Sequence, residues 1–286
     1  MKLLVILLTF HLATASLLDI HVSPDTSDLI KSTDIALTRF FSQQHCKTIN
    51  VFSNETIEID GILKHIESNN LRIKIKSDVT KEQRGRCNYL IFESVQSLMK
   101  VEKWIVSKKF QLSGSFFITF LRRQTMKELQ VAFQALWQKQ IYNLYAIFKD
   151  VNDEVLLMTF DPFADATSCG KAIPKVINKF EKTGRFSKPL EFKTKFMNLN
   201  GCGIRLLSFE DNIAVFKQEH ANGSVTIEGH EIKLMKTIAK ALNFKAELKF
   251  TDGIGKYGNT FENGTATGAF GDLLRMKSDI NFGDLF

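Results

Sequence analysis

The chain has 286 residues and a formal net charge of +7 at pH 7, and hydrophobic residues make up 44% of it. Such a charge is compatible with nucleic-acid binding, but the Lys and Arg residues are dispersed along an exported chain. We therefore exclude nucleic acid and interpret the charge as solvated surface, with attraction to an anionic membrane or ligand as the alternative. Beyond the N-terminus, no stretch approaches the ~18–20 apolar residues that a membrane helix needs.

The first residues, "MKLLVILLTFHLATAS", have the layout of a secretory signal peptide. A lysine precedes an apolar run over residues 3–12, and the small residues Ala13 and Ala15 suit cleavage before Ser16. The run is too short to span a bilayer comfortably, which favours cleavage over an uncleaved anchor. We expect residues 1–15 to be a signal peptide and the remainder to enter the secretory pathway.

Three Asn-x-Ser/Thr tripeptides fit that compartment, at Asn54, Asn222 and Asn263. A single tripeptide of this kind often arises by chance. Three in expected loops of an exported chain predict N-glycosylation.

The four cysteines are Cys46, Cys87, Cys169 and Cys202. In an oxidising compartment their even number favours two disulfides over free thiols, and the absence of C-x-x-C spacing gives little support to a zinc or redox site. Four cysteines allow three pairings. We prefer Cys46–Cys87 within the N-terminal domain and Cys169–Cys202 between a linker and the domain that follows.

Strands and helices alternate through residues 16–160. Helical spacing of apolar residues predicts helices at 26–44, 55–70, 95–110 and 124–140. Short apolar or alternating runs predict strands at 48–53, 71–77, 87–94, 115–121, 142–148 and 154–160, the last two as a hairpin. This alternation predicts an α/β domain with a largely parallel sheet.

Residues 161–197 differ in composition and hold three of the four prolines, Pro162, Pro174 and Pro189. We expect a linker there, with one helix at 172–181, and a second domain over residues 198–286. In that domain the pattern predicts a helix near 230–242, a strand at 245–250, a Gly-rich loop, a helix from Ala269 and a last strand at 278–286.

Motifs that resemble catalytic or cofactor sites lack the context that such chemistry needs. "GIGKYG" at 253–258 matches G-x-G-x-x-G, but loop residues follow it where a dinucleotide site requires a helix. His230 has Leu234, not a second histidine, four residues later. Asp161 and Asp165 flank a proline and are typical of a turn. We expect no enzyme activity and no cofactor.

The second domain carries a resemblance to a known family. Its residues are "IEGHEIKLMKTIAKALNF" at 227–244, "KAELKF", the loop Gly-Lys-Tyr-Gly, Gly268, Gly271-Asp272-Leu273 and Lys277-x-Asp279-Ile280. Together they resemble the first segment of the ligand-binding domain of ionotropic glutamate receptors, and more closely that of the divergent insect ionotropic receptors used in chemosensation. "NLNGCGIRL" at 198–206 looks like the entry to that domain. The resemblance covers roughly residues 196–286.

The fold that the resemblance implies is an N-terminal α/β sheet domain followed by part of one lobe of a periplasmic-binding-protein-like, glutamate-receptor-type domain. The family places an aromatic residue before the Glu-Gly pair, a Pro-x-Thr after the last strand and then an arginine for the ligand carboxylate. Here Ile227 holds the aromatic position, and Asp284-Leu285-Phe286 stands where Pro-x-Thr would be. The resemblance therefore implies that Ile227, Gly283, Asp284 and Phe286 contact the ligand, and we expect no glutamate recognition of the usual kind.

By the same resemblance the full receptor is a ligand-gated cation channel subunit in chemosensory detection. It would lie at the plasma membrane, bind a small-molecule ligand and assemble with ionotropic receptor co-receptor subunits. The pore and the second lobe are not in this sequence, so we expect a partial or truncated receptor. The alternative is a secreted soluble binding or decoy protein that uses the N-terminal domain.

Overall fold

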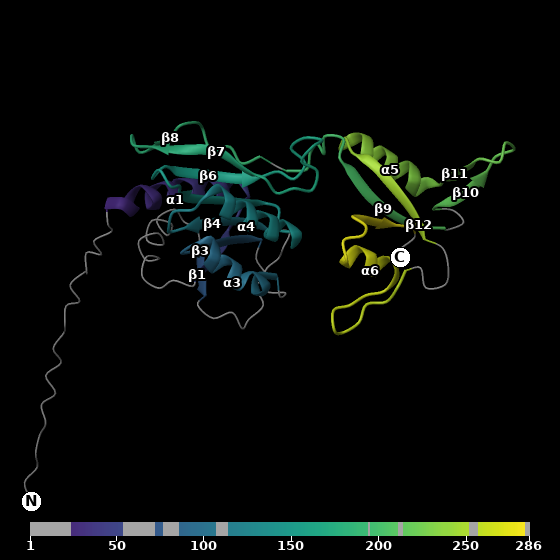
Figure 1. The fold of residues 1–286 in the computed structure, drawn as a ribbon, viewed down its shortest axis with the longest axis horizontal. Coiled ribbons are helices and arrows are strands. Elements are labelled where there is room, and N and C mark those ends of the chain that lie inside the picture. Colours follow the sequence, from purple (N-terminus) through teal and green to yellow (C-terminus); the bar gives the residue numbers. More distant parts are fainter. Residues whose placement is uncertain are drawn as a thin grey trace, which may run out of the picture.

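Two units make up the part of the chain that the structure describes (Figure 1). Residues 187–202, which we call the joining segment, connect them. The computed structural model describes residues 24–53, 72–76, 86–106, 114–193, 195–210, 214–251 and 257–283. The expected signal peptide, the expected helix at 55–70, Asn54, Asp284 and Phe286 lie outside these ranges. None of the helices inside them has the length and apolar character needed to cross a membrane.

An eight-stranded sheet forms the N-terminal unit, in the order β2-β1-β3-β4-β5-β6-β7-β8. The strands from β2 to β5 run parallel, and β6, β7 and β8 are added as antiparallel neighbours. The strands are β1 (Thr48–Ser53), β2 (Arg72–Lys76), β3 (Cys87–Phe92), β4 (Ser115–Phe120), β5 (Leu144–Lys149), β6 (Val155–Phe160), β7 (Pro174–Glu181) and β8 (Arg185–Phe186). The expected α/β domain with a largely parallel sheet is confirmed.

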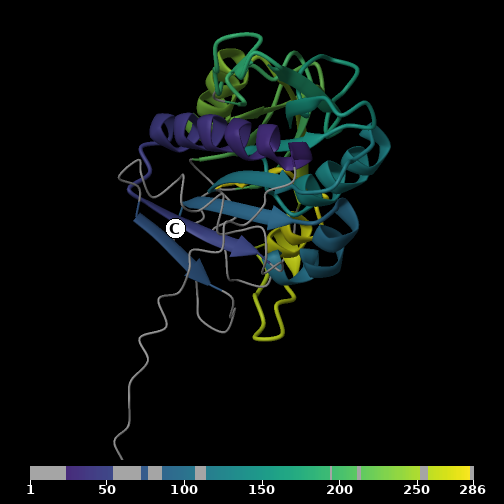
Figure 2. The same cartoon turned by 90° about the vertical axis from the view of Figure 1, so that its left-hand side faces the viewer.

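Helices cover both faces of this sheet. The helix α1 (Pro24–Gln43) lies across one face (Figure 2), and α3 (Val95–Val106) and α4 (Met126–Gln138) pack on the other. A capping box starts α4. The Thr125 hydroxyl accepts the Glu128 backbone N–H, and the Glu128 carboxylate accepts the Thr125 backbone N–H at 2.8 Å. These bonds satisfy backbone donors that the first turn of a helix leaves unpaired.

Alternate residues of the central strands contribute to two cores. In β4, Phe116 and Ile118 pack under α3 and α4, whereas Phe117 packs under α1. Every residue of β3, β4, β5 and β6 is buried. Strands enclosed on both faces have mostly apolar sequences, and this explains why these four were recognisable from the sequence.

The helix expected at 172–181 is wrong, because these residues form the strand β7. It pairs antiparallel with β6, and Ile177 and Phe180 pack on the α1 side of the sheet. Proline is tolerated at the first residue of a strand, where Pro174 lies. The side-chain amide of Asn178 donates to the Lys188 carbonyl at 2.8 Å. The sheet therefore continues through β7 and β8, within the segment expected to be a linker.

The C-terminal unit is a three-stranded parallel sheet in the order β12-β9-β13. Two helices and a hairpin accompany it. Its elements are β9 (Gly203–Phe209), β10 (Phe216–Glu219), β11 (Val225–Glu228), α5 (His230–Ala241), β12 (Lys245–Thr251), α6 (Gly268–Leu274) and β13 (Ile280–Phe282). The expected order of helix, strand, helix and strand is confirmed. Most of the Gly-rich loop at 253–258 lies outside the described residues.

The helix α5 packs its apolar stripe on this sheet. Ile232, Met235 and Ala239 are buried in one cluster with residues of β9 and β13. Asn243 ends the helix with a φ of 51°, the left-handed conformation that asparagine tolerates. The Phe244 N–H then donates to the Ala239 carbonyl at 2.9 Å, which satisfies an end carbonyl of the helix. Asparagine is one of the residues commonly found at this position after a helix.

The preferred cysteine pairing is confirmed. Cys46–Cys87 joins the end of α1 to the start of β3, and Cys169–Cys202 joins the loop between β6 and β7 to the start of β9. The bridges close loops with sequence separations of 41 and 33 residues, and loops of that size correspond to about 4 kcal/mol each in a chain-entropy description. Two disulfides fit a secretory or extracellular location.

Candidate functional site

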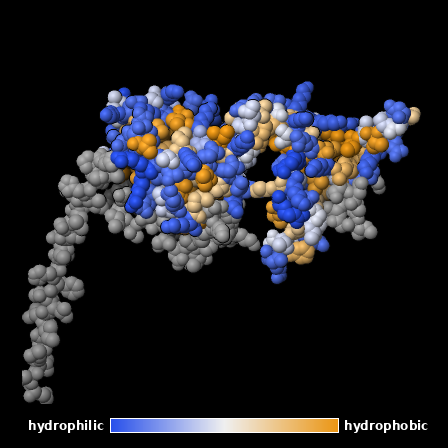
Figure 3. Space-filling model, in the orientation of Figure 1, coloured by the Kyte–Doolittle hydropathy of each residue, from blue (hydrophilic) through white to orange (hydrophobic). Residues whose placement is uncertain are grey.

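A cavity of about 790 Å³ lies between the two units, and we call it the inter-unit cavity. Figure 3 shows the hollow that separates the two bodies. Its N-terminal wall comes from the end of α4, the β6–β7 loop and Tyr142, and Phe196 of the joining segment lies beside them. Its C-terminal wall comes from the start of β9, the end of α6 and the residues just before β13. The cavity therefore lies at the amino ends of β9 and β13.

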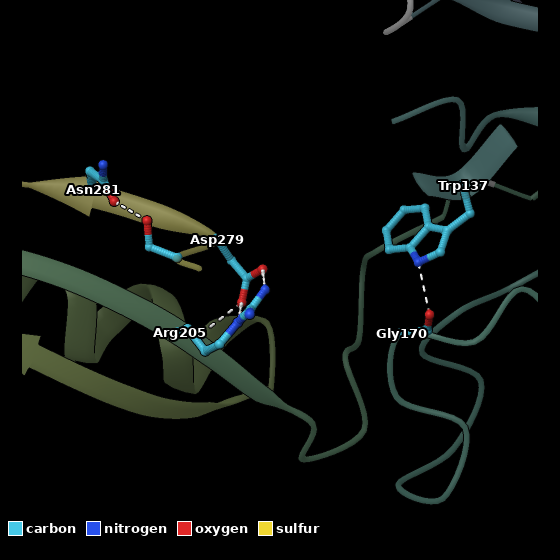
Figure 4. Close-up of polar contacts among 6 residues, drawn as sticks. Trp137, Gly170, Arg205, Asp279 and Asn281 are labelled. Carbon is cyan, nitrogen blue, oxygen red and sulfur yellow. Dashed lines mark hydrogen bonds and ion pairs between the residues drawn. The ribbon is translucent and has the colours of Figure 1, made fainter. Parts of the chain in front are cut away.

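Aromatic rings form the N-terminal wall. The ring of Trp137 at the end of α4 lies 5.9 Å from Phe163 and 6.0 Å from Phe196, between ring centroids. Phe196 also lies 4.8 Å from Tyr142 and 5.5 Å from Phe163. The Trp137 indole N–H donates to the Gly170 carbonyl at 2.9 Å (Figure 4). This bond fixes the orientation of the indole and leaves an apolar, aromatic surface.

An ion pair forms the opposite wall (Figure 4). Arg205 of β9 donates from Nε to Asp279 Oδ2 at 3.0 Å and from Nη2 to Oδ1 at 2.7 Å. The Arg205 backbone N–H donates to the same carboxylate at 2.9 Å. Burial raises the pKa of Asp279, but the hydrogen bonds and the charge of Arg205 outweigh it and hold that pKa below its usual range. The pair is bidentate, the strong geometry for an arginine and a carboxylate.

Ser278, which also lines the cavity, and Asn281 lie beside this ion pair and form further hydrogen bonds. The Ser278 hydroxyl donates to Asn281 Oδ1 at 2.6 Å, and the Asn281 amide donates to the Ala269 carbonyl at 2.5 Å. Asn281 thereby ties β13 to the first turn of α6. Asp279 is held in place by these contacts and by its backbone N–H, which donates to the Arg205 carbonyl at 2.8 Å.

The two walls are tied together where the units meet. Cys169–Cys202 crosses from one unit to the other, and the Asn200 amide donates to the Phe163 carbonyl at 2.7 Å and to the Ala164 carbonyl at 3.2 Å. Phe163 and Phe196 also pack against the core of the C-terminal unit. Covalent, polar and apolar contacts together set the distance between the aromatic wall and the ion pair.

Lys195 anchors the joining segment to the N-terminal unit. Its Nζ donates to the carbonyls of Tyr142 at 2.6 Å and Leu144 at 3.3 Å, and it lies 4.5 Å from the centroid of the Phe160 ring. Burial lowers the pKa of Lys195 to about 7, and the charge of Asp161 partly opposes this shift. A second cavity of about 590 Å³ opens beside Lys195, lined also by Asp161.

The residues suggested by the family resemblance lie elsewhere. Ile227 of β11 is half-buried against the α5 cluster. Gly283 follows β13 with a φ of 119°, and a Cβ there would lie 3.0 Å from the Phe209 ring. Neither residue lines the inter-unit cavity. Asp284 and Phe286 are outside the described residues.

Sequence reasoning did not identify the residues of the inter-unit cavity. Trp137 stood in a predicted amphipathic helix, and Phe163 and Phe196 stood in the expected linker. One usable signal was present, because Asp279 falls on the face of the last strand opposite Ile280 and Phe282. Those two residues do pack in the α5 cluster, as the alternation predicts. A carboxylate on the other face then needs a cationic partner, which the sequence does not identify.

Comparisons with known proteins connect the chain to receptors. Residues 19–198 match the family model described as "Putative ionotropic receptor, ligand binding domain", a match over more than half of the chain. A protein of Anas platyrhynchos named "Probable glutamate receptor" is 43% identical over 54 residues, which are 19% of this chain and 11% of that protein. The chain thus spans a small part of the length of this relative. The family match contains all of β1 to β8. It therefore precedes most of the residues, roughly 196–286, whose sequence resembles the ligand-binding domain of ionotropic glutamate receptors.

Proposed function

The chain belongs to the family of ionotropic receptor ligand-binding domains, and on this premise we propose that it is the extracellular, ligand-recognising part of a ligand-gated cation channel subunit in chemosensory detection. The subunit would lie at the plasma membrane and assemble with co-receptor subunits of the same family. The observation that carries the proposal is the position of β9 between β12 and β13 in the C-terminal sheet.

This position makes β9 a topological switch point. The chain leaves β9 to one side for β12 and crosses to the other side for β13. In open α/β sheets, ligands bind outside the carboxyl ends of the strands at such a point. Gly283 follows the carboxyl end of β13, and a Cβ there would lie 3.0 Å from the ring of Phe209 at the carboxyl end of β9. We call this region the ligand edge.

The start of α5 lies close to the segment that follows β9. The Glu231 backbone N–H donates to the Ala214 carbonyl at 3.2 Å, and a Cβ on Gly229 would lie 2.1 Å from the same oxygen. Ile227 precedes this glycine by two residues. We propose that Ile227, Gly283, Asp284 and Phe286 contact a small-molecule ligand at the ligand edge. Because Ile227 and Asp284 replace the residues that the family uses for glutamate, the ligand is another small organic molecule.

Exposed sequons support an extracellular glycoprotein. Asn222 and Asn263 are exposed, and each side-chain oxygen accepts the hydroxyl of the Ser or Thr two residues later, at 2.7 Å in both cases. Each oxygen also accepts the backbone N–H of that residue at 3.0 Å. The two acceptor sites therefore lie in exposed turns, as N-glycosylation requires. We propose that both carry glycans.

Ligand recognition is tested on the full chain, secreted from eukaryotic cells and purified with its disulfides intact. Thermal unfolding is measured with separate panels of amino acids, carboxylic acids, amines and alcohols. A ligand at about 100 times its Kd stabilises by about 2.7 kcal/mol, which corresponds to a rise in Tm of roughly 5–10 °C. Asp284→Asn should weaken this shift, whereas Asp272→Asn, which removes the partner of Arg275 on α6, should leave it intact. A chain that no panel stabilises would contradict ligand recognition.

The channel role needs a separate experiment. Silencing the transcript that encodes this chain, in the cells that express it, should remove a cation current evoked by the ligand found above. A scrambled silencing sequence is the control. An unchanged current would contradict the channel role while leaving the binding result in place.

A further inference from the structure

The inter-unit cavity is separate from the ligand edge. The cavity contacts Gly203, Ile204 and Arg205 at the amino end of β9, whereas the ligand edge lies at the carboxyl end of the same strand. The length of β9, with a rise of about 3.3 Å per residue, separates the two places. A molecule in the cavity would therefore not occupy the ligand edge.

The size and walls of the cavity fit a small organic molecule. Its volume of about 790 Å³ is within the range of about 300–1,000 Å³ typical of small-molecule sites. Trp137, Phe163 and Phe196 present rings to one side, and aromatic ligands stack on such rings in offset or edge-to-face arrangements. The indole is already held by the Gly170 carbonyl, so little reorganisation is needed on binding.

The charges in the cavity already neutralise each other. Arg205 and Asp279 form a bidentate pair, and the backbone N–H of Arg205 adds a third bond to the carboxylate. An anionic ligand would have to displace Asp279 from Arg205, and a cationic ligand would have to displace Arg205 from Asp279. The two side chains are 40% and 36% exposed, so the loss on displacement is that of the bidentate, charge-assisted hydrogen bonds and not that of a buried charge. A neutral ligand leaves the pair intact.

Hydrogen-bonding groups at the rim complete the site. Gln138 and Gln140, at and just after the end of α4, line the cavity, and a primary amide both donates and accepts. We propose that the inter-unit cavity binds a neutral small molecule with an aromatic or cyclic hydrocarbon body and one hydroxyl or similar group. Because it contacts both units, this molecule couples their relative position without occupying the ligand edge.

Tryptophan fluorescence tests this proposal on the full-length chain. The chain has two tryptophans, and Trp104→Phe leaves Trp137 as the reporter. The probe is 2-(4-bromophenyl)ethanol, because bromine quenches indole fluorescence on contact. Its charged counterparts, 4-bromophenylacetate and 2-(4-bromophenyl)ethylamine, share the same body. We expect saturable quenching by the alcohol and at least tenfold weaker affinity for both ions. Unsaturable quenching by the alcohol, or an ion that binds as tightly, would overturn the proposal.

Two neighbouring leucines of α6 provide a matched pair of variants. Leu273 lines the cavity, Leu274 does not, and both are exposed, at 38% and 59%. Leu273→Phe should narrow the cavity and weaken the alcohol at least tenfold, whereas Leu274→Phe should leave its affinity unchanged. Equal affinity in both variants would place the probe elsewhere and refute the site. Unfolding curves of both variants confirm that they fold.

Asp284→Asn separates this site from the proposed function. Asp284 is one of the residues proposed to contact the ligand at the ligand edge, and its substitution should leave the affinity for the alcohol unchanged. A loss of alcohol binding in this variant would show that the two places are one site, against the inference. Failure to bind the panel ligands, with alcohol binding retained, would count only against the ligand edge.

Discussion

Replacing Lys195 by methionine should remove a specific pH dependence of stability in the N-terminal unit. Its Nζ is enclosed by two backbone carbonyls and the ring of Phe160, and burial lowers its pKa from 10.5 to about 7. Between those values the unfolded chain holds a proton on this amine that the folded chain has largely lost. The unfolded state then binds more protons, so stability rises with pH through this window.

The magnitude follows from the two pKa values. For a pKa near 10.5 in the unfolded chain and about 7 in the folded chain, raising the pH from about 7 to about 9 adds about 2 kcal/mol to the free energy of unfolding. Tyrosines oppose this rise only slightly, because an unfolded tyrosine, with a pKa of about 10, is still mostly protonated at pH 9. Burial raises the pKa of Tyr145 to about 12 and raises that of Tyr89 as well. Both remain protonated in the folded protein at pH 9.

The assay is urea unfolding, followed by circular dichroism, with disulfides intact, at both pH values. The wild-type chain should gain about 2 kcal/mol between them, and Lys195→Met should lose this gain. Lys193→Met changes an exposed lysine two residues away and should retain it. An equal pH response in the wild type and Lys195→Met would refute the reasoning, because the amine would then titrate alike in both states.

Three further predictions concern the joints and the surface. Replacing Cys169 and Cys202 together by serine should destabilise the chain by up to about 4 kcal/mol and expose the joining segment to limited proteolysis; cleavage at the wild-type rate would contradict this. Asn222→Gln and Asn263→Gln should each remove one glycan from the secreted chain, measured as a step in mass, and an unchanged mass would show that the turn is not modified. Hydrogen exchange should be faster in α5 and β13 than in α4 and β5, because the three-stranded sheet buries less than the eight-stranded one; equal protection would contradict that ranking.

Local sequence patterns were sufficient to predict the elements that are buried on both faces or that show a clear apolar spacing. The strands β3 to β6 are enclosed on both faces, so their sequences are mostly apolar. The buried polar or charged exceptions are Asn88, Ser115, Thr119, Lys149 and Thr159. The helices α4 and α5 were predicted from the spacing of their apolar residues, and the structure adds a capping box at Thr125 and Glu128 and a left-handed Asn243 at their ends. The cysteine pairing needed one further preference among three arrangements, and the observed bridges agree with it.

The strand β7 was missed because its short sequence fits two periods. Val176, Ile177 and Phe180 can be placed on one side of a helix or along a strand, and the pairing with β6 decides between them. That pairing depends on the loop after β6, which returns the chain to the sheet, and on β6 having an edge with which β7 can pair. Neither is visible within the ten residues concerned.

The inter-unit cavity was beyond sequence reasoning for a different reason. Its aromatic wall combines Trp137, Phe163 and Phe196, and its polar wall combines Arg205 and Asp279. The two charged residues are separated by 74 positions and meet only because β9 and β13 are neighbours in the sheet. A site assembled from separate elements in this way leaves no motif in the sequence.

The disulfide between the units also restricts how one unit could move relative to the other. Cys169–Cys202 and the backbone of the joining segment follow different paths, yet both arrive at the start of β9 (Figure 1). These covalent connections converge on one place, and the Asn200 hydrogen bonds and the packing of Phe163 and Phe196 hold the two units together beside it. A tilt of one unit about this joint would change the width of the inter-unit cavity more than it changes the distance between the units at the joint. In such a tilt the carboxyl end of β9, at the ligand edge, would move farther than its amino end, because it lies farther from the joint.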